Sequence, residues 1–133
     1  MKRVLFVVLL VVMLTPAFGI EVDVAGNYST RYMFRGERLV DNAVVSPMLT
    51  LKMESLELSA ASIYDVKKDE VFRHVYQLTF KTQINKIGLD TGFVRYDPRK
   101  GADATTEFFA KASWKGNWQP SLTVFFDVKE VLE

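Results

Sequence analysis

The chain has 133 residues, of which 49% are hydrophobic and 13% aromatic, and it contains no cysteine. This length allows one domain at most, and 17 Lys and Arg against 16 Asp and Glu leave no basic excess of the kind that binds nucleic acid. The lack of cysteine excludes disulfides, thiolate metal sites and a lipidated N-terminal cysteine.

The first 19 residues have the pattern of a secretory signal peptide. Lys2 and Arg3 precede an unbroken apolar run at 4–14, and the small residues Ala17 and Gly19 occupy the positions that signal peptidase reads. The apolar run is much shorter than the roughly 20 residues that a helix needs to cross a bilayer, which disfavours a membrane anchor. The sequence therefore predicts export, with cleavage after Gly19 and a mature domain at 20–133.

From residue 20 onwards apolar and polar residues alternate with period two. No window keeps the i, i+3, i+4, i+7 spacing of an amphipathic helix. In the clearest segment, Leu78 and Phe80 alternate with Gln77 and Lys81. The sequence predicts an all-β protein, an antiparallel up-and-down meander with strands at about 22–34, 44–53, 55–65, 72–84, 86–96, 105–114 and 118–128.

The predicted connections alternate in length. Tight turns follow the second, fourth and sixth strands, whereas longer polar loops at 36–43, 66–71 and 97–103 follow the first, third and fifth. Short turns on one side and long loops on the other are typical of outer-membrane β-barrels, whose short turns lie in the periplasm. Trp114 and Trp118 flank a short turn, where an interfacial aromatic girdle is expected. Together with the signal peptide, this pattern favours an outer-membrane barrel.

The predicted strand number is odd. Bacterial single-chain barrels have an even number of strands, and an open sheet would leave unpaired backbone groups in the bilayer. The sequence also ends in Val131-Leu132-Glu133, without the aromatic residue usual at the end of a last barrel strand. We expect an incomplete barrel of about seven strands, a piece of a longer one. Assembly from several chains, or a strand hidden within the predicted seven, would also account for the odd number.

Several short motifs carry a resemblance to a known family. Tyr32-Met33-Phe34-Arg35-Gly36 resembles the opening motif of the TorF-type porin family, bacterial outer-membrane proteins without assigned substrates. Residues 87–98, 106–114 and 123–128 are similar to later strands of that family, and the order of the motifs is what makes the resemblance specific. It covers about 27–128 and implies an outer-membrane barrel. The family has no established catalytic residues, and its members continue with further strands.

The polar faces of the strands hold the candidate functional residues. No Gly-rich phosphate loop, metal-ligand cluster or nucleophile elbow occurs in the mature sequence, so it gives no support for an enzyme, a cofactor or a metal. Mixed charges in a lumen tune which solutes pass, although a solvated sheet face explains any single residue equally well. The residues expected to line or approach a lumen are Arg31, Arg35, Glu57, Arg73, Gln77, Lys81, Asp90, Glu107 and Lys111.

The sequence favours an outer-membrane porin-like protein, surrounded by lipid, that passively admits small hydrophilic solutes. It leaves the solute, the pore size and the oligomeric state open. The alternative is a secreted or periplasmic β-sandwich or small barrel that binds a ligand or protein, with its apolar face turned inward. A barrel-embedded hydrolase acting on envelope lipids is a third hypothesis. It needs a Ser/His pair in one pocket, and the position of the sole histidine, His74, on the predicted lipid side disfavours it.

Overall fold

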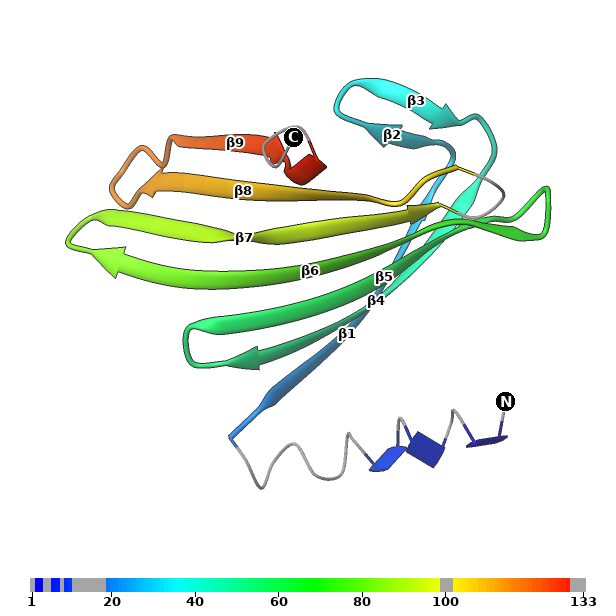
Figure 1. The fold of residues 1–133 in the computed structure, drawn as a ribbon, viewed down its shortest axis with the longest axis horizontal. Helices are drawn as coiled ribbons and strands as arrows, with labels where there is room; N and C mark the ends of the chain where they lie inside the picture. Colours follow the sequence, from blue (N-terminus) through cyan, green and yellow to red (C-terminus); the bar gives the residue numbers. More distant parts are fainter. Residues whose placement is uncertain (1, 4–5, 8, 11–18, 99–101, 130–133) are drawn as a thin grey trace.

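The computed structural model describes residues 2–3, 6–7, 9–10, 19–98 and 102–129 (Figure 1). Much of the predicted signal peptide, residues 99–101 of a predicted loop, and Val131-Leu132-Glu133 lie outside the described residues. No helix in the described part of the chain is long and apolar enough to cross a membrane. Nine strands are described: β1 (Glu21–Ser29), β2 (Tyr32–Phe34), β3 (Glu37–Val40), β4 (Val44–Met53), β5 (Leu56–Asp65), β6 (Glu70–Ile84), β7 (Ile87–Pro98), β8 (Thr105–Trp114) and β9 (Ser121–Asp127).

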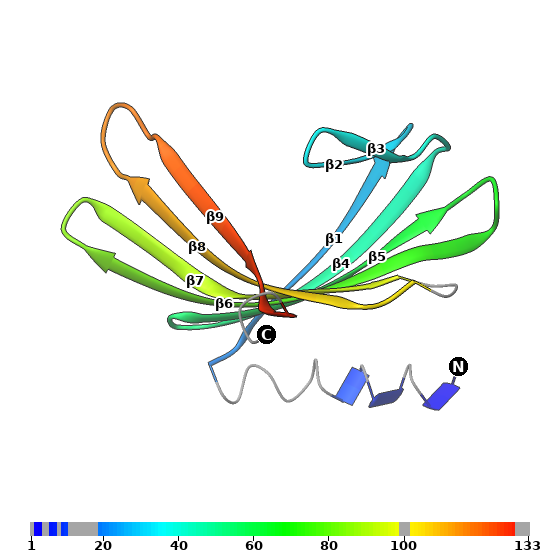
Figure 2. The same cartoon turned by 45° about the horizontal axis from the view of Figure 1, so that its top comes forward.

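Seven of these strands form one antiparallel sheet in the order β1-β4-β5-β6-β7-β8-β9, and β2 pairs with β3 in a separate hairpin. Neighbours in the sheet are consecutive in the chain, except that β1 and β4 flank the hairpin. The predicted all-β, antiparallel up-and-down fold is therefore confirmed. Over the described residues the sheet is not closed, because β1 and β9 stand at its two edges. The sheet is curved, and hairpin β2–β3 lies on its concave side (Figure 2).

The prediction of one strand at 22–34 is wrong. The Ser29 hydroxyl donates a 2.6 Å hydrogen bond to the Arg31 carbonyl oxygen at a bend that ends β1. After β2, Arg35-Gly36 has φ angles of 50° and 84°, the left-handed pair that a two-residue hairpin turn requires. The predicted loop at 36–43 consequently contains β3. The alternation is continuous through β1 and β2 because both are extended, so it does not reveal the bend.

The other six predicted strands match the structure to within three residues at each end. The tight turns around Glu54 and Asn85 are confirmed, and these residues have φ angles of 44° and 54°. The turn between β8 and β9 is longer than predicted. Pro120 has no N–H to give to a strand ladder, and only its carbonyl oxygen pairs, 3.0 Å from the Trp114 nitrogen. Because the loop predicted at 66–71 is also shorter, the length asymmetry of the connections is weaker than the sequence indicates.

A small hydrophobic cluster fixes the hairpin to the concave side of the sheet. Val40 of β3 packs with Val44 of β4 and Ile63 of β5, and Tyr32 and Phe72 border this cluster. The sequence pattern assigns Phe72 to the opposite face. The register between β5 and β6 shifts just past Ile63 and inserts one extra residue into β6, so the alternation changes phase there. Phe72 therefore packs with the hairpin.

The two faces of the sheet differ in exposure, and the apolar face is the exposed one. On β6, Phe80 is 49% exposed and the adjacent Thr79 is 5% exposed. On β7, Phe93 is 47% exposed and Val94 is 2% exposed. Neighbouring residues of a strand point to opposite faces. Apolar side chains therefore cover the convex face, and the mostly polar face is sheltered on the concave side. The hairpin lies on that concave side (Figure 2).

Candidate functional site

Charged side chains on the concave face form one row across the sheet. The register places Lys81 directly opposite Asp90, and Asp90 directly opposite Lys111. The sign of the charge changes at each strand, an arrangement in which neighbouring strands attract one another. In strand order from β1 to β8 the row consists of Asp23, Lys52, Glu57, Lys81, Asp90 and Lys111. Asp23 and Lys52, and likewise Glu57 and Lys81, are diagonal neighbours, and Glu21 is the residue directly opposite Lys52.

Two contacts in this row are ion pairs. Lys52 Nζ lies 2.5 Å from Asp23 Oδ2, and Lys81 Nζ lies 2.7 Å from Glu57 Oε2. Their side chains are 24% to 50% exposed, and pairs this wet each stabilise a fold by only about 0 to 1 kcal/mol. The row is therefore better understood as a hydrated belt of balanced charge than as a source of stability. The sequence predicts four of its residues, and a register is needed to add Asp23 and Lys52.

Gln77, another predicted lumen residue, stands on the concave face of β6 and donates a 3.1 Å hydrogen bond to Thr79 Oγ1. Across from Thr79 is Gly92 of β7. A β carbon added to Gly92 would come within 1.8 Å of the Leu78 carbonyl oxygen. Only glycine permits this close approach of β6 and β7.

Arg35, at the tip of hairpin β2–β3, bridges to the concave face of the sheet. Its two terminal nitrogens each donate a hydrogen bond to one carboxylate oxygen of Glu107 on β8. This hydrogen bonding raises the pKa of Arg35 above its usual value, so the guanidinium stays charged. The group also lies 4.1 Å from the ring centre of Phe125, which packs against Phe109. These two rings interrupt the polar pattern of β8 and β9, and they form the apolar floor beneath Arg35.

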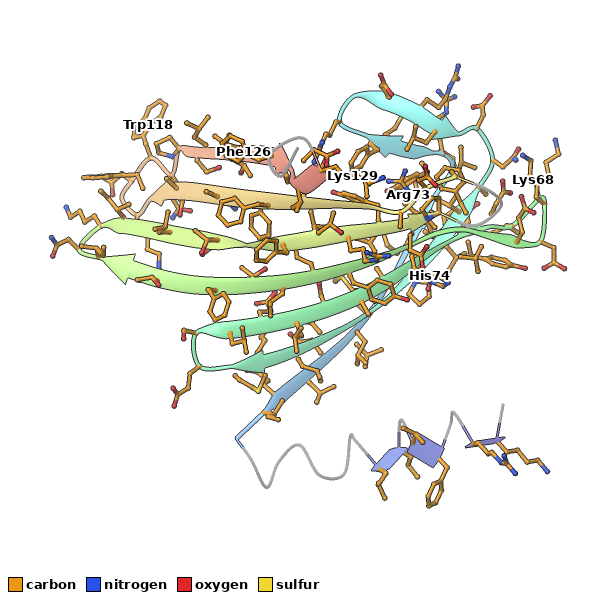
Figure 3. The ribbon with its side chains drawn as sticks, viewed as in Figure 1. Lys68, Arg73, His74, Trp118, Phe126 and Lys129 are labelled. Carbon is orange, nitrogen blue, oxygen red and sulfur yellow. The ribbon has the colours of Figure 1, made fainter. Side chains whose placement is uncertain are left out.

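Arg73 holds the same hairpin from the opposite direction. Its guanidinium lies among four aromatic rings, two from β2 and two from the sheet, at 5.1 to 5.9 Å from their centres; these are Tyr32, Phe34, Phe72 and Tyr96. Within the described residues its buried Nε has no hydrogen-bond partner. Figure 3 shows Arg73 at the end of the sheet that the hairpin covers. Arg35 therefore reaches from the hairpin to the sheet, and Arg73 reaches from the sheet to the hairpin. We call these two sets of contacts the clamp.

The predicted site residues thus fall into separate groups. Glu57, Lys81, Asp90 and Lys111 belong to the charge row, with Gln77 nearby. Arg35, Glu107 and Arg73 belong to the clamp that holds the hairpin. Arg31 joins neither group, since it is exposed at the bend between β1 and β2.

His74 lies on the convex face, as expected from its strand phase, between Ser62 of β5 and Asp97 of β7. Its Nδ1 is 2.8 Å from the Ser62 hydroxyl of β5. The sequence does not single out Ser62, because a serine in an alternating strand gives no signal until the register is known. No group of three or more His, Cys, Asp or Glu that could hold a metal ion occurs among the residues that the structure describes.

Comparison with protein-family models, with curated proteins and with solved structures finds no match to this chain. The resemblance to TorF-type porins therefore stays a prediction.

Proposed function

We propose that the protein is porin-like, resides in the bacterial outer membrane, and passively admits small hydrophilic solutes. The observation that carries this proposal is the inverted arrangement of the sheet faces, with apolar residues on the exposed convex face and the charge row on the concave face. A water-soluble sheet buries its apolar face against a second layer. A barrel in lipid does the reverse and keeps its interior polar.

The height of the apolar face fits a bilayer. On β7 and β8 it begins at the Ile87–Trp114 pair and is bounded at the other end by the polar Arg95–Thr106 pair. Eight residues of β7 separate these levels, or about 21 Å along the membrane normal at a strand tilt of about 40°. Outer-membrane barrels have an apolar band about 25 Å tall with aromatic residues at its borders, and Trp114 supports this placement at the short-turn side.

The concave face suits hydrated solutes without strong preference for one charge. The charge row alternates in sign, so its net field is small. The hairpin covers part of the long-loop end of this face (Figure 2), and a lumen would be narrowed there. These features support passage of small polar molecules, with the clamp of Arg35 and Arg73 setting the width of the entrance.

The test is to express the full chain, fractionate the cells, and compare gel mobility before and after boiling in detergent. We expect a heat-modifiable band in the outer-membrane fraction and ion conductance in planar bilayers. Arg35→Gln should raise the conductance, because the hairpin loses its hold on Glu107. Arg38→Gln is the matched control, because within the described part of the chain Arg38 forms an ion pair only with the nearby Asp41, at 3.3 Å.

A species that is soluble in the periplasm without detergent would overturn this proposal. That result would favour the alternative of a soluble β-protein that binds a ligand or partner, whose apolar face must be covered by another layer. Unchanged conductance of Arg35→Gln in a working pore would leave the passage of solutes standing and would contradict the role assigned to the hairpin.

A further inference from the structure

Ser62 and His74 form a polar pair on the mostly apolar convex face. They are direct partners in the register of β5 and β6, and both are partly buried. The Ser62 Oγ lies 2.8 Å from His74 Nδ1. A serine hydroxyl in hydrogen-bond contact with an imidazole is the nucleophile and base arrangement that acyl transfer uses.

A carboxylate stands in the same row on the other side of the histidine. The register of β6 and β7 places Asp97 directly opposite His74, and β carbons of such pairs lie about 5 Å apart. Ser62, His74 and Asp97 therefore occupy three adjacent strands with the imidazole in the middle. The serine contacts Nδ1, so Asp97 would orient the ring through Nε2. In the serine-protease triad the serine contacts Nε2 and the aspartate contacts Nδ1. Here the two nitrogens are exchanged, but the residues keep the roles of nucleophile, base and orienting carboxylate.

An apolar groove lies directly below this row on the convex face. Its wall includes Leu49, Leu51, Leu58, Tyr76, Leu78 and Phe93, and Arg95 stands at its rim. Arg95 is opposite Tyr76, one row below the His74–Asp97 pair. No carboxylate among the described residues forms an ion pair with Arg95, and its Nη1 makes only a 3.5 Å contact with Thr106 Oγ1. The groove matches an acyl chain, and the exposed guanidinium matches a phosphate.

We propose that this row is an esterase site for the acyl chains of membrane glycerophospholipids. Ser62 Oγ attacks the ester carbonyl while His74 takes the hydroxyl proton. The tetrahedral intermediate then collapses, the ester C–O bond breaks, and the leaving lysophospholipid alcohol receives the proton from His74. Water, activated by His74, hydrolyses the acyl-serine bond and releases a fatty acid. Arg95 holds the lipid phosphate during acylation, and the phosphate leaves with the lysophospholipid before water attacks.

This activity goes beyond solute passage, and it rests on the proposed membrane location. Asp97 lies ten residues above Ile87 on β7, which corresponds to about 26 Å along the normal. The row therefore sits at the border of an apolar band about 25 Å tall, where the ester groups of lipids lie. The lipid-side position of His74, which at the level of the sequence disfavours a lipid hydrolase, suits this reaction, because a lipid reaches the protein from that side.

The experiment uses the full chain, folded in detergent, with a fluorophosphonate probe that labels activated serines. We expect a covalent adduct on Ser62, located by peptide mass spectrometry, and release of fatty acid from phosphatidylglycerol in mixed micelles. Ser62→Ala should abolish both. His74→Asn should slow labelling by about 100-fold. The matched control Ser46→Ala, on the concave face of β4 and outside the groove, should leave both unchanged. Arg95→Gln should raise KM about tenfold for phosphatidylglycerol with little change in kcat.

A folded chain that is not labelled at Ser62, or that is labelled equally fast in His74→Asn, overturns the esterase site. Fatty-acid release that persists in Ser62→Ala also overturns it. The two proposals fail separately. A conducting, heat-modifiable protein that fails to label contradicts only the esterase. A labelled, membrane-inserted protein that does not conduct contradicts only the passage of solutes.

Discussion

Gly92 offers a test of the sheet geometry that depends on no assumption about function. A β carbon at this position would lie 1.8 Å from the Leu78 carbonyl oxygen, and ordinary contact begins at 3.4 Å. In Gly92→Ala the two strands must separate by about 1.6 Å, the difference between these values. That movement disrupts about two ladder hydrogen bonds worth about 1 kcal/mol each and adds overpacking of about 1 kcal/mol. After the gain of about 0.5 kcal/mol from replacing a strand glycine, we expect a net loss of about 2 to 3 kcal/mol.

The measurement is urea unfolding of the folded chain in detergent, followed by the fluorescence of Trp114 and Trp118. Gly26→Ala is the matched control, since Gly26 is also a strand glycine and nothing lies within 4 Å of the position that its β carbon would take. It should be neutral or stabilising by about 0.5 kcal/mol. Equal stability of Gly92→Ala and wild type would refute the close approach of β6 and β7, and so would an equal loss in the control.

Three further results follow from local geometry. Arg35→Gln and Glu107→Gln should show a coupling of about 1 kcal/mol in a double-mutant cycle, and each should speed proteolysis within the hairpin; additive effects would contradict the bridge. Asn85→Ala should cost about 1 kcal/mol in urea unfolding because its φ is 54°, whereas Asn85→Gly should cost less; equal losses would contradict a left-handed turn. Lys81→Gln removes a positive charge and leaves Glu57 without its ion-pair partner. In a conducting protein it should shift the reversal potential in the direction of greater cation selectivity. An unchanged reversal potential would place the charge row outside the pore.

The parts of the fold that depend on side-chain alternation are predictable from the sequence. β4 and β8 have the predicted bounds because clear turn residues flank both strands, and in β8 the alternation resumes after Phe109. The bend after β1 leaves the alternation intact, so hairpin β2–β3 is missed. The extra residue near Phe72 reverses the phase locally, and a uniform two-residue period cannot show it.

The contacts of the candidate sites depend on the register, which the sequence alone leaves open. Arg35 and Glu107 are 72 positions apart, and their pairing requires both the unseen turn and the curvature of the sheet. The Ser62–His74 pair is hidden for a related reason. A one-residue slip between β5 and β6 would point the two side chains to opposite faces, so only a fixed register brings them together.

Strand direction limits how this sheet can close around a lumen. Six antiparallel steps lead from β1 to β9, so the two edge strands run in the same direction. Direct pairing of the edges would be parallel, and an antiparallel closure needs an odd number of additional strands, whichever chain supplies them. The charge row constrains the additional strand that would pair with β1. A strand beside β1 faces Asp23, so a base at that level would continue the alternation. In a bilayer each unpaired edge group costs several kcal/mol, so pairing of these edges, rather than side-chain packing, controls whether the sheet is stable in lipid.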